Sequence, residues 1–158
     1  MDAIQIGGFN DQEITAQVKS GMESGTGTPR ILAFCCENSG FEAGEMAKIF
    51  QMQVPDGLRM IKVPCAGKID LDHIFNAFVS GADGVVVMAC HPKNCKSENG
   101  NTFAQWRVNE AHRMMEEAGF QKDRLRFVGI ASNMASEFSH IVVDMEQKIN
   151  RLGLSPLK

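Results

Sequence analysis

Gly84-Val85-Val86-Val87-Met88-Ala89-Cys90 is the most apolar stretch of the chain, and it decides the fold class. Its three consecutive valines favour a strand, because β-branched side chains fit a pleated surface better than a helical one. A short apolar run without polar alternation is typical of a strand buried on both faces, as in a parallel sheet. The polar segment from His91 to Asn101 follows directly and indicates a loop at the carboxyl end of this strand.

From Arg30 onward, strand-like and helix-like segments alternate along the chain. Further strands are predicted at residues 31–36, 58–63 and 124–130, and helices at residues 39–53, 70–81, 102–118 and 138–152. This alternation predicts a single α/β domain with a small parallel sheet, flavodoxin-like or Rossmann-like. In such sheets ligands bind beyond the carboxyl ends of the strands.

The first 29 residues differ in composition from the rest. Residues 20–29 are rich in Gly, Ser and Thr and end in Pro29, which is typical of a flexible linker. A short helix is predicted before it, at residues 11–19. We therefore expect residues 1–29 to form a flexible N-terminal extension and linker, residues 30–152 the domain, and residues 153–158 a C-terminal tail.

The overall composition excludes several classes of protein. The 158 residues have a formal net charge of −3, so a nucleic-acid partner is not expected. No apolar run approaches the roughly 20 residues that a membrane-spanning helix needs. The N-terminus lacks the basic and apolar regions of a signal peptide, which predicts a cytoplasmic protein without a membrane partner. Five cysteines in that compartment favour metal binding or redox chemistry over disulfides.

All five cysteines follow or end predicted strands. Cys35 and Cys36 end the first strand, Cys65 follows the second, Cys90 ends the third, and Cys95 lies in the loop after it. Because parallel strands end at one edge of a sheet, we expect these cysteines to converge there. A single buried cysteine can also be a small hydrophobic residue, and strand alternation places Cys35 and Cys36 on opposite faces. One of that pair is therefore expected to belong to the core.

Thiolates at such an edge could bind an iron-sulfur cluster, zinc or copper(I). An iron-sulfur cluster takes four cysteines, and this chain has enough. Zinc could use His91 as a nitrogen ligand, although no Cys-x2-Cys pair typical of small zinc sites is present. The residues therefore leave the choice of metal open.

Other chemistries have little support in the sequence. No phosphate-binding loop and no Gly-x-Gly-x-x-Gly after a strand is present, and neither Cys35 nor Cys95 has the arginine that a cysteine phosphatase needs. We expect His73, His112 and His140 to lie at the surface or at helix edges. Lys68, Arg107 and Arg113 are expected to be solvated or paired with acidic side chains.

Three segments resemble the delta, or iron-sulfur, subunit family of methyl-viologen-reducing hydrogenase. They are residues 31–36, Val63-Pro64-Cys65-Ala66-Gly67-Lys68-Ile69-Asp70, and the stretch from Gly81 to Cys95 with its Cys-His-Pro-x-x-Cys motif. Gly100, Asn101 and Arg107 continue the similarity, which spans about residues 30 to 152.

The resemblance implies an electron-transfer subunit with a [2Fe-2S] cluster. Such a subunit would relay electrons between a hydrogenase or other dehydrogenase and a heterodisulfide-reductase-like flavin subunit. The cluster would be bound by Cys65, Cys90 and Cys95, with Cys35 or Cys36 as the fourth ligand. The alternatives are a cluster-free assembly subunit of the same kind of complex and a stand-alone thiol redox protein.

The chain departs from the family pattern at Ser39, where a further cysteine is usual, and at Lys96 and Ser97 after the last cysteine. Ser39-Gly40-Phe41-Glu42 fits the capping-box pattern at the start of a helix. The Ser39 hydroxyl is therefore expected to accept a hydrogen bond from a backbone N–H and not to replace the missing cysteine as a ligand.

Overall fold

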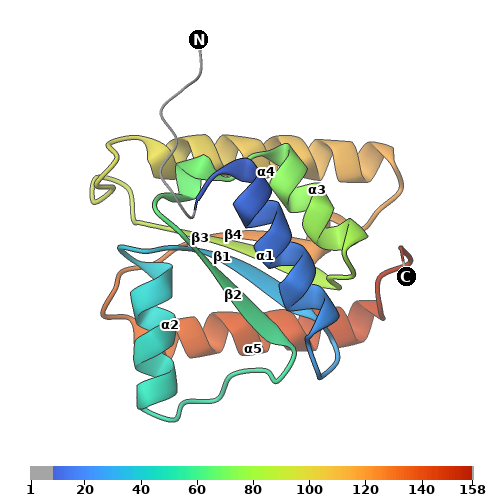
Figure 1. Cartoon of the computed structure of the whole chain (residues 1–158), viewed down its shortest axis with the longest axis horizontal. Coiled ribbons are helices and arrows are strands. Elements are labelled where there is room, and N and C mark those ends of the chain that lie inside the picture. Colours follow the sequence, from blue (N-terminus) through green and yellow to red (C-terminus); the bar gives the residue numbers. More distant parts are fainter. Residues whose placement is uncertain (1–8, 158) are drawn as a thin grey trace.

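A four-stranded parallel sheet forms the centre of the protein (Figure 1). The computed structural model describes residues 9–157. The strands are β1 (Ile31–Cys36), β2 (Leu58–Val63), β3 (Gly84–Ala89) and β4 (Leu125–Gly129), in the order β2-β1-β3-β4. All three neighbouring pairs are parallel, so the carboxyl ends of the strands share one edge. The predicted α/β class and single small parallel sheet are confirmed.

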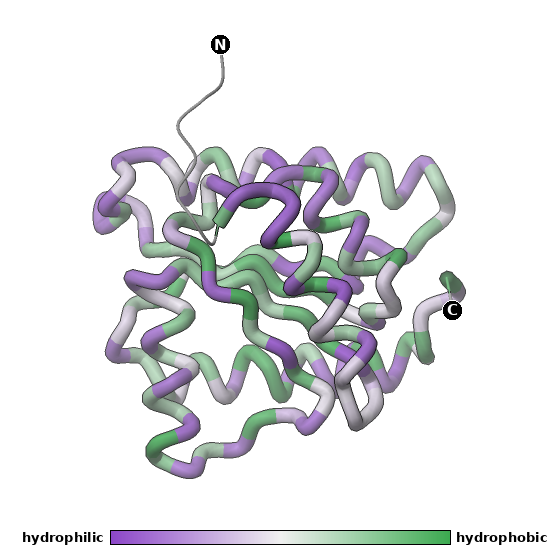
Figure 2. The backbone as a smooth tube through the Cα atoms, in the orientation of Figure 1, coloured by the Kyte–Doolittle hydropathy of each residue, from purple (hydrophilic) through white to green (hydrophobic). Residues whose placement is uncertain are grey.

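Five helices among the described residues cover the two faces of this sheet (Figure 1). One face is covered by α1 (Asp11–Glu23), α3 (Leu71–Val79) and α4 (Gly100–Glu117), and the other by α2 (Gly40–Ile49) and α5 (Ala135–Leu152). Short 3₁₀ turns, Ala66–Lys68 and Lys122–Arg124, follow β2 and precede β4. Figure 2 shows hydrophobic backbone segments concentrated along the central strands.

Two hydrophobic cores lie on opposite faces of the sheet because strand side chains alternate in direction. In β1, Phe34 and Cys36 pack with α1, α3 and α4, whereas Ala33 and Cys35 pack with α2 and α5. All six residues of β1 are buried, as are all six of β3. The continuous apolar runs in the sequence therefore reflect two-sided burial.

The structure corrects the prediction for the N-terminal segment. A helix was expected to end at residue 19, before a flexible linker, but α1 continues to Glu23. Ile14, Val18 and Met22 recur at helical spacing and are fully buried in the core shared with α3 and α4. Burial of Met22 keeps the last turn helical although its composition resembles a linker. The first eight residues of the expected extension, and Lys158 of the expected tail, lie outside the described residues.

The second helix is also shorter than predicted. It ends at Ile49 instead of residue 53, and Gln51 adopts a left-handed conformation with φ of 54°. The Met52 backbone N–H then donates to the Ala47 carbonyl, which closes the end of the helix. In residues 9–157, no helix combines the length and apolar character needed to cross a membrane.

Candidate functional site

The carboxyl edge of the sheet brings three cysteine-bearing strand ends side by side. Since β1 lies between β2 and β3, the segment after Cys36 has the Cys65 loop on one side and Cys90 on the other. Cys95 lies in the loop that joins Cys90 to α4. The five cysteines are all free thiols.

Cys36 and Cys90 form the first thiol pair. Their Sγ atoms are 3.7 Å apart, and both residues are buried. The Cys36 Sγ also lies 3.9 Å from the Pro64 carbonyl oxygen, so it faces the loop that leads to Cys65. Burial raises the pKa of Cys36 to about 11, and the neighbouring Cys90 thiol contributes in the same direction. The Cys36 thiol therefore stays protonated at neutral pH.

Cys65 and Cys95 form the second pair, held against the start of α4. A Cβ atom added to Gly100 would lie 2.1 Å from the Cys65 Sγ and 3.5 Å from the Cys95 Sγ. Both sulfurs therefore use the space that the absent side chain of Gly100 leaves. Gly67 fits as closely, since a Cβ there would lie 2.8 Å from the Gly100 Cα.

The electrostatic environment of Cys95 differs from that of Cys36. Burial disfavours the Cys95 thiolate, but backbone N–H groups of Asn101, Ser97 and Gly100, together with the Cys65 thiol, outweigh it and lower the pKa of Cys95. These N–H groups belong to the N-terminus of α4 and the turn before it, where a negative charge is stabilised.

Cys35 does not join either pair. It is fully buried on the opposite face of the sheet, where its thiol donates to the Ala33 carbonyl at 3.6 Å and lies 4.0 Å from the Met88 Sδ. Burial raises the pKa of Cys35 far above its ordinary value. The expectation that all five cysteines converge is therefore wrong for Cys35, because strand alternation directs it into the second core.

Two polar side chains of α4 fasten the cysteine loops. The Asn101 side-chain amide donates to the Cys90 carbonyl at 3.1 Å, and its oxygen accepts from the Thr102 N–H at 2.8 Å. The Arg107 guanidinium donates to the carbonyls of Gly67 and, at 2.9 Å, Ile69. Arg107 was predicted to be solvated or ion-paired, but it holds the 3₁₀ turn after Cys65. Gly100, Asn101 and Arg107 thus support both thiol pairs.

Ser39 does not cap α2 as predicted. Its backbone (φ −152°, ψ −88°) leaves the helix N-terminus without a side-chain hydrogen bond. Its hydroxyl is completely buried and has no hydrogen-bond partner. It lies close enough to Cys36 to stabilise the Cys36 thiolate, which acts to lower the pKa of Cys36 against the larger effect of burial. Together with Asn38, Cys90 and His91, Ser39 lines a cavity of about 220 Å³ between the ends of β1, β3 and β4. An unpaired polar group thus faces the first thiol pair.

His91, which the sequence offered as a possible nitrogen ligand for zinc, lines a cavity together with Cys90. Among residues 9–157, the one group of three potential ligand atoms within 4.8 Å of one another is Asp11, Asp70 and His73, which includes no cysteine. His91 therefore does not complete a compact site with the thiol pairs. His73, which was expected at the surface or at a helix edge, is instead buried, with a side chain only 2% exposed. The sequence signal for it was the Asp70-x-x-His73 spacing, which forms a capping box at the start of α3.

Two thiol pairs, a glycine that leaves room for sulfur, and backbone N–H groups directed at one pair suit a metal centre with soft ligands. The family model for methyl-viologen-reducing hydrogenase, delta subunit, matches residues 31–153, which include all five cysteines and their supporting residues. The chain belongs to this family.

Two relatives are similar to the chain over most of their length. The F420-non-reducing hydrogenase vhu iron-sulfur subunit of Methanocaldococcus jannaschii is 35% identical over 130 residues, which are 82% of this chain and 97% of that protein. The corresponding subunit of Methanopyrus kandleri is 32% identical over 123 residues, 78% of this chain and 93% of that protein.

A third relative has a different organisation. One of the subunits of the ferredoxin:CoB-CoM heterodisulfide reductase of Methanosarcina mazei is 26% identical over 151 residues, 96% of this chain but only 19% of that protein. A domain similar to this delta-subunit chain is therefore one part of a much longer reductase chain.

Proposed function

We propose that the chain is an electron-transfer subunit whose Cys36, Cys65, Cys90 and Cys95 bind one [2Fe-2S] cluster. The observation that supports this most is the arrangement of four thiols as two separate pairs at the carboxyl edge of the sheet. Cys35, on the other face, is a core residue in this proposal.

The spacing of the thiols favours two metal ions over one. With metal–sulfur bonds of about 2.3 Å, two thiolates on one tetrahedral ion lie about 3.8 Å apart. The Cys36–Cys90 separation of 3.7 Å fits one such ion. A single zinc ion would need all four sulfurs at that spacing, but no three cysteine sulfurs of the described chain lie within 4.8 Å of one another. A cluster of two irons, each with two thiolates, suits the two pairs better.

The chain's own residues supply what a relay centre needs. Such a cluster accepts and releases one electron at a time. The N–H groups around Cys95 stabilise negative charge on the sulfurs, while Asn101 and Arg107 keep the loops in place as that charge changes. Cys65 and Cys95 are only half-buried, so the second pair lies nearer to the surface. Electrons can therefore enter or leave on that side.

The relatives indicate the partners. The delta-subunit relatives are named as hydrogenase subunits, and the heterodisulfide reductase relative contains a similar domain within a longer chain. Domains that are fused in one protein and separate in another commonly contact each other in both. We therefore propose two partners, of which one is a heterodisulfide-reductase-like flavin subunit and the other is a hydrogenase or other dehydrogenase subunit.

Anaerobic reconstitution with iron and sulfide tests the cluster. The expected result is about two irons and two acid-labile sulfides per chain, with visible absorption and an electron paramagnetic resonance signal on one-electron reduction. Cys90→Ser should lose most of the iron, and Cys35→Ser is the matched control that should retain it. About one zinc per chain without iron would overturn the proposal, as would an iron content that Cys90→Ser leaves unchanged.

A further inference from the structure

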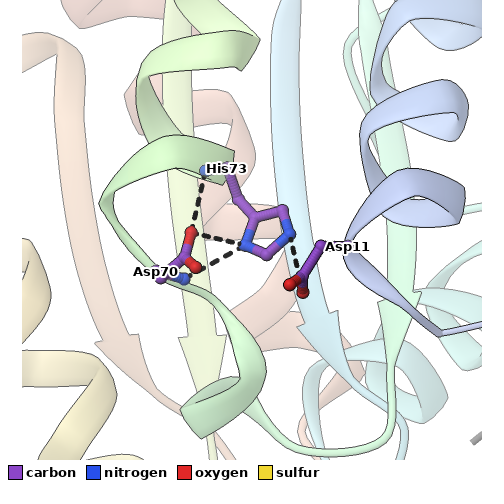
Figure 3. Close-up of side chains that lie close together, drawn as sticks. All are labelled: Asp11, Asp70 and His73. Carbon is purple, nitrogen blue, oxygen red and sulfur yellow. Dashed lines mark hydrogen bonds and ion pairs between the residues drawn. The ribbon is translucent and has the colours of Figure 1, made fainter. Parts of the chain in front are cut away.

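Asp11 of α1, the α3 N-cap residue Asp70, and His73 of α3 lie together on the face of the sheet covered by these two helices (Figure 3). One ligand atom from each residue falls within 4.8 Å of the other two. Asp11 precedes the family-matched range of residues 31–153, so this group joins a helix outside the match to a helix within it.

The ring of His73 is oriented by Asp70. Its Nδ1 lies 2.8 Å from the Asp70 Oδ1 and 3.2 Å from the Asp70 backbone nitrogen. The ring can therefore accept from that N–H, or carry the proton on Nδ1 and donate it to the carboxylate. The second arrangement leaves a lone pair on Nε2. A carboxylate that holds the far nitrogen of a histidine in this way is the usual neighbour of a metal-binding imidazole.

The other ring nitrogen is not explained by helix capping. The capping box accounts for the Asp70 side chain, the His73 backbone N–H and the ring Nδ1. The Nε2 is buried, has no hydrogen-bond partner, and points toward the Asp11 Oδ1 at 3.6 Å (Figure 3). Two ligand atoms about 3.6 Å apart can both bind one ion, because zinc–nitrogen and zinc–oxygen bonds are about 2.0–2.2 Å long.

A cation already binds Asp11. The Lys68 ammonium lies 2.6 Å from the Asp11 Oδ1, so a metal ion must compete with it for that oxygen. A cavity of about 440 Å³ adjoins the group and is lined by Asp11, Asp70, Asp72, His73 and Asn76 among others, so water could complete a coordination shell. The Asp11 side chain is 62% exposed and can adjust to a bound ion.

We propose that Asp11 and His73 bind a divalent transition-metal ion of the zinc class. The His73 Nε2 and the Asp11 carboxylate are the protein ligands, and water fills the remaining positions. The His73 Nδ1 then carries the ring proton and donates it to the Asp70 carboxylate, in place of the bond that it accepts from the Asp70 N–H in the capping box. The ion displaces the Lys68 ammonium from Asp11 and fastens α1 to α3. This site is independent of the cysteine centre.

Histidine-ring ¹⁵N nuclear magnetic resonance during a Zn²⁺ titration of the full chain tests the proposal. The chain has four histidines, so His73 can be followed separately even while the thiols also take up zinc. We expect the His73 Nε2 resonance to shift on metal binding and the ring proton to be on Nδ1 in the metal-bound state. An unchanged His73 resonance at all zinc concentrations would overturn the site.

Four variants separate the roles. Asp11→Asn should weaken zinc binding at His73 more than tenfold, and Asp70→Asn, which can still cap α3, should weaken it about 10- to 100-fold. Lys68→Gln should tighten it, because a competing cation is removed. Asp72→Asn makes the same charge change beside the same cavity and should leave binding unchanged. An Asp11→Asn chain that titrates like the wild type would contradict the assignment.

Discussion

The Sγ atoms of Cys36 and Cys90 lie 3.7 Å apart although the two residues are 54 positions apart in the sequence. The contact exists because β1 and β3 are adjacent and parallel. Cys35 lies opposite Met88, so the two strands end at the same level of the sheet. Asn101 fixes the Cys90 carbonyl from α4, and Gly100 leaves space for the second pair. The thiol positions are therefore set by the sheet and by the N-terminus of α4.

Single Cys→Ser changes should divide the cysteines into two classes. Cys36→Ser, Cys65→Ser, Cys90→Ser and Cys95→Ser should each lose or strongly alter the visible absorption of the reconstituted protein. Cys35→Ser should keep the spectrum and iron content, with a stability loss of about 1–3 kcal/mol, because a hydroxyl replaces a buried thiol on the apolar face. Iron analysis and chemical denaturation measure the two effects. A Cys35→Ser protein without iron would show that the opposite face takes part.

Gly100→Ala should disturb the second pair. The new Cβ would lie 2.1 Å from the Cys65 Sγ, and the neighbouring Gly67 loop leaves no room for the helix to retreat. We expect a loss of about 1–3 kcal/mol of stability and reduced iron incorporation. Gly21→Ala is the matched control, since its Cβ would meet only the Arg59 side chain at ordinary contact distance. It lies inside α1 and should stabilise the chain by about 0.5–1 kcal/mol. Normal iron content in Gly100→Ala would show that the second thiol pair does not need the space at Gly100.

Ser39→Ala should stabilise the cluster-free chain, opposite to the effect of removing a helix cap. The buried Ser39 hydroxyl has no hydrogen-bond partner, so its removal should raise the free energy of unfolding by about 1 kcal/mol. Ser139→Ala is the control and should destabilise, because its hydroxyl donates to the Gln53 carbonyl at 2.6 Å. Urea denaturation compares the two. A loss of stability in Ser39→Ala would restore the capping interpretation.

In the cluster-loaded protein, Ser39→Ala should lower the reduction potential. The hydroxyl lies beside Cys36, and a hydrogen bond to a ligand sulfur stabilises the reduced cluster. Potentiometric titration measures the shift. An unchanged potential would mean that this hydroxyl does not interact with the bound sulfur.

The sequence predicted the elements of this fold well because their signals are local. The apolar runs at β1 and β3 marked strands buried on both sides, and the Asp70 cap marked the start of α3. Whether Cys35 or Cys36 faces the other cysteines depends on which face of the sheet α4 covers. The pairing of Asp11 with His73 depends on the packing of α1 against α3. Neither relation has a local signal, so both needed the three-dimensional structure.

Alkylation of the cluster-free chain should order the thiols by pKa and exposure. The lowered pKa of half-buried Cys95 means that more thiolate is present at a given pH, and the thiolate is the reacting species. Cys95 should therefore react with iodoacetamide at a lower pH than an ordinary cysteine does. Cys36, with a pKa raised to about 11 by burial, should react appreciably only as the pH approaches that value, and Cys35 should react only on unfolding. Peptide mass spectrometry at a series of pH values gives the rate for each cysteine.

Asn101→Ala tests whether the N-terminus of α4 lowers the pKa of Cys95. Loss of the Asn101 side-chain bond to the Cys90 carbonyl should loosen the start of α4 and raise the pH at which Cys95 reacts. If Cys36 reacted before Cys95 at pH 7, the helix N-terminus could not be what stabilises the Cys95 thiolate.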